Sequence, residues 1–218
     1  MVTSEFQRAR SVSAKQQREQ AILDAAAMLG AERGIRQVTL TDIAEVIGMH
    51  KSALLRYFET REPIFLRLTA AGWREWSADL RDRLAGLAEA TPSAIAEVFA
   101  TTLTSRPMFC DLLAQAPLNL ERNVSLESVR AFKLVTLEEV TAIVGALREL
   151  LPALDDGDGV DVIATATSLA GAFWQMATPG AEVQALYRSD PRLAHAVVNV
   201  EPRLVRILTA QLAGLLAR

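Results

Sequence analysis

Apolar residues recur at every third or fourth position along most of this chain, which is the spacing of helices that bury one face. The first such run covers residues 22–29, and Gly34 behind it is a typical left-handed helix end. Residues 1–15 are polar and basic without this period. We therefore expect a flexible arm there, and a first helix that starts near Gln16.

Two short helices are predicted next, over residues 39–47 and roughly 51–58. Thr39 and Asp42 have the spacing of a capping box, with aspartate where glutamate is commoner, and Gly48 stops the first helix. Helices this short are not stable alone, so the two must pack on one another. The apolar side chains available for that packing are Ile43, Ala44, Ile47, Leu54 and Phe58.

From residue 61 onward the pattern predicts a larger helical domain. One long helix is expected over roughly 61–87, and a valine-rich alternating stretch that would mark a strand occurs nowhere. The predicted fold class is therefore all-α, with a three-helix head over residues 16–60 and a bundle of about six helices over residues 61–218. Further helix starts are expected near Thr91, Pro107, Ser125, Asp158 and Glu201.

Composition limits the class of protein. The chain has 218 residues, of which 50% are hydrophobic, and this is enough to bury a core. Its single cysteine, Cys110, excludes an intrachain disulfide, and its two histidines are too far apart in sequence to suggest a metal site. No nucleophile–base pair and no phosphate-binding glycine loop occurs in the sequence. We therefore expect no enzyme, no cofactor and no metal, and a protein of the reducing cytoplasm.

Residues 162–181 carry no charge and need a membrane test. Polar side chains interrupt the stretch, Pro179 ends it, and the acidic Asp161 and Glu182 flank it, which does not suit a membrane anchor. We interpret it as a helix that is buried on most of its faces. Together with the leucine-rich run over residues 204–216, it is predicted to form a four-helix interface with a second copy; central helices of the monomer are the alternative.

The segment from Thr39 to Phe58 has the spacing of a helix-turn-helix unit. Its second helix is expected to turn polar and cationic side chains outward, where they can reach phosphates or base edges. Basic residues of the arm, such as Arg8 and Arg10, would follow the DNA backbone or enter a minor groove. On spacing alone, a purely structural three-helix subdomain is the alternative. The outward residues of the second helix are His50, Lys51, Ser52, Arg56 and Tyr57.

The head also carries a series of residues at fixed spacing: Ile22-Leu-Asp-Ala-Ala-Ala, Glu32-Arg-Gly34, Val38-Thr39, Asp42-Ile43-Ala44, Gly48, Leu54, Tyr57-Phe58 and Arg61-Glu62. This series resembles the DNA-binding head of the tetracycline-repressor (TetR) family of bacterial transcription regulators, over roughly residues 18–66. The rest of the chain resembles the family in length and helical pattern alone. The resemblance implies a homodimer in which each head places its third helix in a major groove, while the larger domain binds an inducer and dimerises.

The resemblance also implies roles for single residues. Thr39 corresponds to the N-cap residue of a helix whose start faces a phosphate. Lys51, Tyr57 and Arg61 correspond to positions that touch the DNA backbone. Base-edge or backbone contacts are often made at the positions of His50 and Ser52. The predicted DNA-binding residues are Thr39, Thr41, His50, Lys51, Ser52, Arg56, Tyr57 and Arg61.

Three positions depart from the family pattern. His50 stands where serine or threonine usually caps the recognition helix, and imidazole is a weaker cap. Ser52 stands where glycine or another small residue is common. Leu55 replaces a frequent tyrosine, so one phosphate contact is lost unless Arg56 supplies it. These departures leave the operator sequence open. They also keep a rival function in view, a helical scaffold or small-molecule carrier whose head no longer binds DNA.

Aromatic side chains concentrate in the larger domain, where the resemblance would put a ligand cavity. A bundle core is the alternative for each of them, and a buried indole N–H needs a partner in either case. The apolar helices hold no cluster of charges, which favours a neutral, mostly apolar effector of unknown identity. The predicted effector-binding residues are Trp73, Trp76, Phe99, Phe109, Phe132, Trp174 and Gln175.

Charge divides along the same boundary. Residues 1–61 hold nine Lys and Arg against seven Asp and Glu, a net of +2, whereas residues 62–218 hold 14 against 19, a net of −5. A mildly basic head on an acidic body fits a protein that reads DNA with its head, although a difference this small also arises by chance. The sequence therefore predicts a homodimeric, cytoplasmic, ligand-responsive repressor that binds a double-stranded DNA operator and no membrane.

Overall fold

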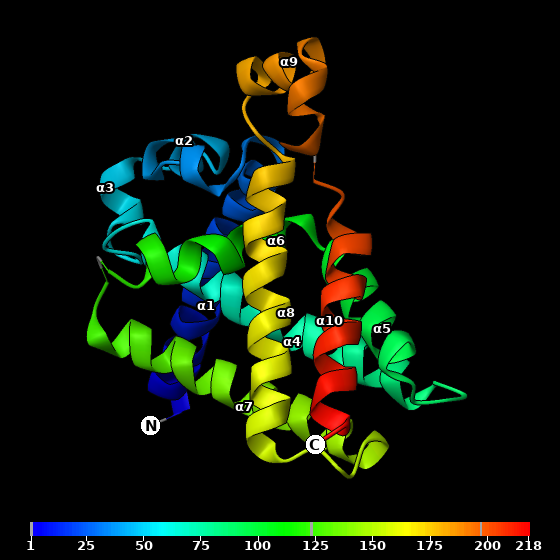
Figure 1. Cartoon of the computed structure of the whole chain (residues 1–218). Coiled ribbons are helices and arrows are strands. Elements are labelled where there is room, and N and C mark those ends of the chain that lie inside the picture. The colour runs from blue at the N-terminus through cyan, green and yellow to red at the C-terminus, as the bar shows by residue number, and fades with distance from the viewer. Residues whose placement is uncertain (1, 123, 197) are drawn as a thin grey trace.

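The computed structural model (Figure 1) describes residues 2–122, 124–196 and 198–218, without the side chains of residues 2–13, 194 and 195. Every regular element in these ranges is helical, which confirms the predicted fold class. The head consists of α1 (Val2–Arg33), the short 3₁₀ turn η1 (Ile35–Gln37), α2 (Leu40–Val46) and α3 (Lys51–Leu54).

Helix α1 is longer than predicted. It begins at Val2 rather than near Gln16, so the segment expected as an irregular arm continues the helix. Neither glycine nor proline occurs between residue 2 and Gly30, and nothing else in this polar stretch stops a helix. The end of α1 is as predicted, because Gly34 has a φ of 81° directly after the last helical residue.

The helix-turn-helix unit is held by a few buried side chains. Ile43 of α2 and Leu54 of α3 are both fully buried, and Gly48 in the turn between the helices has a φ of 65°. Helix α3 ends at Leu54 rather than near Phe58. The reason is that the backbone N–H groups of Arg56 and Tyr57 bond three residues back, to Ala53 and Leu54, which tightens the last turn.

The body holds seven α-helices in the described ranges, and most of their starts are as predicted. The hydroxyls of Thr91 and Ser125 each accept the backbone N–H three residues on. The cap of the uncharged helix is Asp155 rather than Asp158, and the two residues form a reciprocal capping box. The body elements are α4 (Glu62–Ala85), α5 (Pro92–Thr104), α6 (Pro107–Gln115), η2 (Ala116–Leu120), α7 (Leu126–Leu150), α8 (Asp156–Ala177), α9 (Ala181–Ser189), η3 (Pro191–Ala196) and α10 (Val200–Leu216).

The body is a packed bundle that meets the head where α4 and α6 pack on α1, and α6 also contacts η1. Helix α4 leads from the head into the body and packs on α7, while α10 packs on α5 and lies beside α8 (Figure 1). Helices α6 and α8 cross so closely that a Cβ at Gly171 would lie 2.9 Å from the backbone N of Ala114. Helix α9 lies beyond the end of α8 and buries none of its own residues.

The uncharged stretch forms α8, which has one buried and one exposed face. Val162 and Ala166 lie in the core, whereas Ala164 and Ala172 are exposed. Helix α10 is similar, since Leu204, Leu208 and Leu212 are fully buried while the opposite side of the helix is exposed. Both helices therefore belong to the core of the monomer on one side. No helix in the described part of the chain is long and apolar enough to cross a membrane.

Candidate nucleic-acid interface and effector clefts

The start of α2 carries the predicted capping box. The Thr39 hydroxyl accepts the N–H of Asp42 at 3.2 Å, and the Asp42 carboxylate accepts the N–H of Thr39 at 2.8 Å. Hydrogen bonds from the backbone and side chain of Thr39 lower the pKa of Asp42, and the nearby guanidinium of Arg33 adds to this effect. The box fixes the first turn of α2, on which Thr39 and Thr41 are both exposed.

Helix α3 divides into a buried and an exposed side. Leu54 is fully buried, whereas Lys51 and Ser52 are exposed, as is Arg56 in the turn directly after the helix. No carboxylate among the described residues pairs with Lys51 or Arg56, so both cations are available to phosphates. His50 stands at the N-cap, and its side chain makes no capping hydrogen bond, as predicted for imidazole. Apart from the exposed Leu55, this side is therefore polar and cationic, on a frame held by buried apolar residues.

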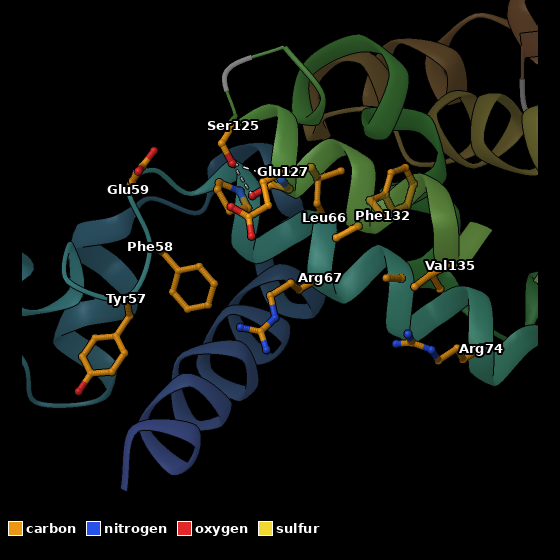
Figure 2. Close-up of a pocket in the computed structure, with 14 residues that line it drawn as sticks. Tyr57, Phe58, Glu59, Leu66, Arg67, Arg74, Ser125, Glu127, Phe132 and Val135 are labelled. Atoms are coloured by element: carbon orange, nitrogen blue, oxygen red, sulfur yellow. Dashed lines mark hydrogen bonds between the residues drawn. The ribbon is translucent and has the colours of Figure 1, made fainter. Parts of the chain in front are cut away.

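Tyr57 and Phe58 follow α3 in the chain, and their side chains point in opposite directions. Figure 2 shows that the Tyr57 hydroxyl points away from α4, while the ring of Phe58 points toward Arg67. Phe58 is buried, and the guanidinium carbon of Arg67 lies 5.6 Å from its ring centroid. Phe58 therefore anchors the end of the helix-turn-helix unit to α4, and Tyr57 remains half-exposed beside the cationic side of α3.

Arg61 lies at the junction of head and body rather than on the exposed side of α3. Its two terminal nitrogens donate to the carbonyls of Ile35, at 2.7 Å, and Arg36, at 3.2 Å. The guanidinium carbon stands 5.0 Å from the ring centroid of Phe65, and burial lowers the pKa of Arg61. Although it was expected to touch the DNA backbone, this side chain holds η1 to the start of α4.

Four of the predicted effector residues form a packed aromatic cluster. The rings of Trp73 and Trp76 meet edge to face with centroids 5.4 Å apart, and Phe99 lies 6.0 Å from Trp76. Phe109 fills the space above Gly72, where an added Cβ would come within 2.4 Å of its ring. In this structure the four side chains make up the core of the bundle, which was the alternative considered for them.

Two polar groups inside this core, the Trp76 indole and the Cys110 thiol, have hydrogen-bond partners. The Trp76 indole N–H donates to the Thr102 hydroxyl at 3.0 Å. The Cys110 thiol donates to the carbonyl of Leu103 at 3.3 Å, and burial, with a contribution from Asp111, raises the pKa of Cys110 to about 12. A thiol that stays protonated at neutral pH is a small core residue and a poor nucleophile.

One cleft opens between the head and α7, with a volume of about 540 Å³. We call it the α4–α7 cleft; Figure 2 shows Leu66 and Arg67 of α4 on one side of it and Phe132 of α7 on the other. Of the predicted effector residues, Phe132 lines it. The Arg67 guanidinium already pairs with Glu19 at 2.8 Å, so this cation is satisfied within the protein.

A larger cleft, of about 840 Å³, opens on another side of the head–body junction. We call it the α1–α8 cleft; it lies between the Gly30–Gln37 segment, the start of α6 and the end of α8, where the predicted Trp174 and Gln175 line it. Asp111 of α6 also lines this cleft. Its carboxylate accepts the Ile35 N–H at 2.9 Å and the Gln175 side-chain amide at 2.7 Å.

The sequence did not mark Asp111 as a site residue. It lies in an apolar context directly after Cys110, and its hydrogen-bond partners are 76 and 64 residues away. A single acidic residue inside an apolar helical run is the signal that could have pointed to it, because aspartate is rarely buried without a partner.

An exposed cationic helix on a helix-turn-helix frame, joined to an all-helical body, defines a DNA-binding transcription regulator. Comparison with known families gives the same class. Residues 22–68 match the bacterial regulatory proteins of the tetR family, and residues 70–218 match the tetracyclin repressor-like C-terminal domain. The chain belongs to the TetR family, as its head predicted.

Solved structures show the same fold. FadR of Thermus thermophilus, a TetR-family repressor in complex with lauroyl-CoA, is 18% identical with a TM-score of 0.58, over 91% of this chain and 93% of its own. A TetR/AcrR-family regulator from Thermobifida fusca is 21% identical with a TM-score of 0.52, over 88% and 97%. The fatty acid degradation regulator FadR of Bacillus halodurans is 15% identical with a TM-score of 0.50, over 88% and 94%. A comparison with the curated proteins gives no match.

Proposed function

We propose that this regulator is a cytoplasmic repressor that binds its operator through the exposed side of α3. The observation that carries the proposal is the pair of exposed cations without carboxylate partners, Lys51 on α3 and Arg56 in the turn directly after it, beside the buried Leu54. Lysine and arginine contacts to phosphates position a protein on DNA, and shorter polar side chains read base edges. His50 and Ser52 stand where such reading takes place.

A second copy would pack on the exposed sides of α8 and α10. On α8 a row of exposed residues without charge recurs every four positions, which lets another helix approach closely. Exposed Ala210 and Ala213 extend this surface over α10. The row on α8 consists of Val160, Ala164, Ser168, Ala172 and Met176.

A small, mostly apolar effector would occupy a cleft at the head–body junction and release the operator. The aromatic cluster is filled by its own side chains, whereas both clefts touch head and body together. A ligand that binds more tightly to the arrangement of the heads that does not fit the operator shifts the protein toward that arrangement. The affinity for the operator then falls by the difference between the ligand's binding free energies for the two arrangements. Helix α4 is the lever that would carry the change to the head.

A mobility-shift titration on operator DNA at several salt concentrations tests the docking. The Lys51→Ala variant is expected to bind all sequences more weakly and to lower the slope of log affinity against log salt by about 1. Tyr57→Phe is expected to weaken binding in the same uniform way. Arg130→Ala, which removes an exposed arginine on α7, is the matched control and should bind as the original chain does. Unchanged affinity of Lys51→Ala and Tyr57→Phe would count against α3 as the DNA-contacting helix.

Light scattering tests the dimer. The full chain is expected to have twice the monomer mass at micromolar concentration, and Ala164→Arg, on the exposed side of α8, is expected to shift it toward the monomer. A monomer in the original chain would overturn the proposed interface without bearing on the α3 docking.

A further inference from the structure

Asp111 is a buried carboxylate without a cation. It is 9% exposed, and no lysine, arginine or histidine side chain among the described residues lies within ion-pair distance. Its two partners are a backbone N–H and an amide, both neutral, and each carboxylate oxygen accepts one of them. Buried aspartates are normally ion-paired, because taking a charge out of water is costly. The remaining lone pairs of Asp111 therefore offer a site for a positive group.

The surroundings of Asp111 in the α1–α8 cleft favour a cation as well. Helices α1 and α8 both end at this cleft, and the last carbonyls of a helix carry partial negative charge. Gln175 gives its amide N–H to Asp111, which leaves its side-chain oxygen without a donor in the described part of the chain. The indole of Trp174 adds an aromatic surface, on which cations also bind favourably.

Other charged groups also face the cleft, but they do not cancel its preference for a cation. Arg33 lies 3.6 Å from the carboxylate of Asp42 and 3.9 Å from that of Glu32, which also lines the cleft. Arg36 lines the cleft with an exposed side chain that makes no ion pair in the described structure. The start of α6, at Pro107, contributes the positive end of one helix dipole. Arg36 is therefore the main repulsive group for a cation at Asp111.

We propose that the α1–α8 cleft binds an amphiphilic cation, with its ammonium or guanidinium group on Asp111 and its apolar part against Trp174 and against Met108 of α6, which also lines the cleft. The inference deepens the proposed function, on which it rests, by naming the chemical class of the effector. A mostly apolar molecule with one positive end satisfies both the charge of Asp111 and the volume of about 840 Å³.

The same contact explains how the ligand would act on the head. Asp111 accepts the Ile35 N–H of η1 and the Gln175 amide of α8, so one carboxylate joins the head to the proposed dimer helix. A cation on the free lone pairs of Asp111 draws negative charge from the same two oxygens and so weakens the hydrogen bonds that they accept from these two partners. Ligand binding therefore changes how η1 is held, and η1 is also bonded to Arg61 at the start of α4.

Three probes with the same phenylbutyl body test the charge preference by calorimetry on the full chain: 4-phenylbutylamine, 4-phenylbutanol and 5-phenylvalerate. The amine is expected to bind at least about tenfold more tightly than the alcohol, and the acid more weakly than either. Asp111→Asn should abolish the advantage of the amine, while Asp82→Asn, which removes an exposed carboxylate on α4, should retain it. Arg36→Gln should strengthen binding of the amine alone, which a purely structural role of Asp111 would not produce.

Several outcomes would overturn the proposal. These are equal affinity for the three probes, an amine advantage that persists in Asp111→Asn, or no amine binding up to about 1 mM. Arg36→Gln keeps the test decisive if Asp111→Asn does not fold. Operator binding is measured separately by mobility shift. Amine binding that leaves operator affinity unchanged would support the cation site and contradict its effector role, whereas absence of any specific DNA binding would contradict the proposed function alone.

Discussion

The head and the body of this protein build their binding surfaces in different ways. In the head, seven of the eight predicted DNA-binding residues lie within the short segment 39–57, and the local helix-turn-helix geometry exposes most of them. By contrast, the α1–α8 cleft at the head–body junction is assembled from Gly34 of the head and Asp111 and Gln175 of the body, which come from three distant segments. A surface made by one segment follows from its helical period, whereas a cleft depends on how helices pack. Packing also decides which aromatic residues of the body fill its core and which line a cleft.

The largest expected effect concerns two tryptophans of the body. Trp76 is fully buried and bonded to Thr102, so Trp76→Ala should lower the free energy of unfolding by about 3–5 kcal/mol. Trp174 lines a cleft and is half-exposed, so Trp174→Ala should cost at most about 1–2 kcal/mol. Urea unfolding of both variants measures the difference. Equal losses would contradict the division into core and cleft residues.

Substitutions at two glycines test how closely the helices of the body pack. Gly171→Ala places a methyl group against the backbone of α6, so it is expected to cost about 1–3 kcal/mol of stability. Gly145 on α7 has open space around its Cβ position, so Gly145→Ala should stabilise the protein by about 0.5–1 kcal/mol through helix propensity. Thermal unfolding of both variants tests this. A stabilising Gly171→Ala would mean that α6 and α8 are not held in close contact.

In the head, a substitution at His50 is expected to change the free energy of unfolding by less than the changes at Trp76 and Gly171 in the body. Since the imidazole makes no capping bond, His50→Ser should stabilise the protein by about 0.5–1 kcal/mol. His50→Ala is the control and should give no such gain. The serine variant should also change the preferred DNA sequence, and a selection that returns the original consensus would argue against a base-reading role for this position.

The smallest expected effect is a pH dependence in the α2 capping box. Hydrogen bonds from Thr39 lower the pKa of Asp42 in the folded state, so the ionised carboxylate stabilises the head. This contribution is complete above the ordinary aspartate pKa of about 3.9 and is lost as pH falls through the lowered folded value. The stability difference between the original chain and Asp42→Asn should therefore stay constant from about pH 7 to pH 5 and shrink below about pH 4. A difference that persists into strong acid would contradict this account.

The sequence predicted those features that depend on neighbouring residues. The capping box of Thr39 and Asp42 and the left-handed end at Gly34 arise from backbone and side chains a few positions apart. Helix boundaries were less predictable, as α1 shows. A polar stretch without period looks irregular in sequence, yet it continues as a helix when no glycine or proline interrupts it.

The cleft residues could not be predicted in the same way. Trp76 and Trp174 look equivalent in the sequence, and packing alone separates a filled core from a cleft wall. Arg61 matched a family position that touches DNA, but its guanidinium binds the carbonyls of η1. Hydrogen bonds across 25 or more positions leave no periodic signal in a sequence.

Selection of genomic DNA fragments by the purified full chain tests the central claim, that the exposed side of α3 reads DNA as part of a dimer. The original chain should enrich a sequence with two symmetric half-sites, and the His50→Ser variant should enrich one that differs at the same position in both halves. Fragments that are no more alike than the starting pool would contradict the claim.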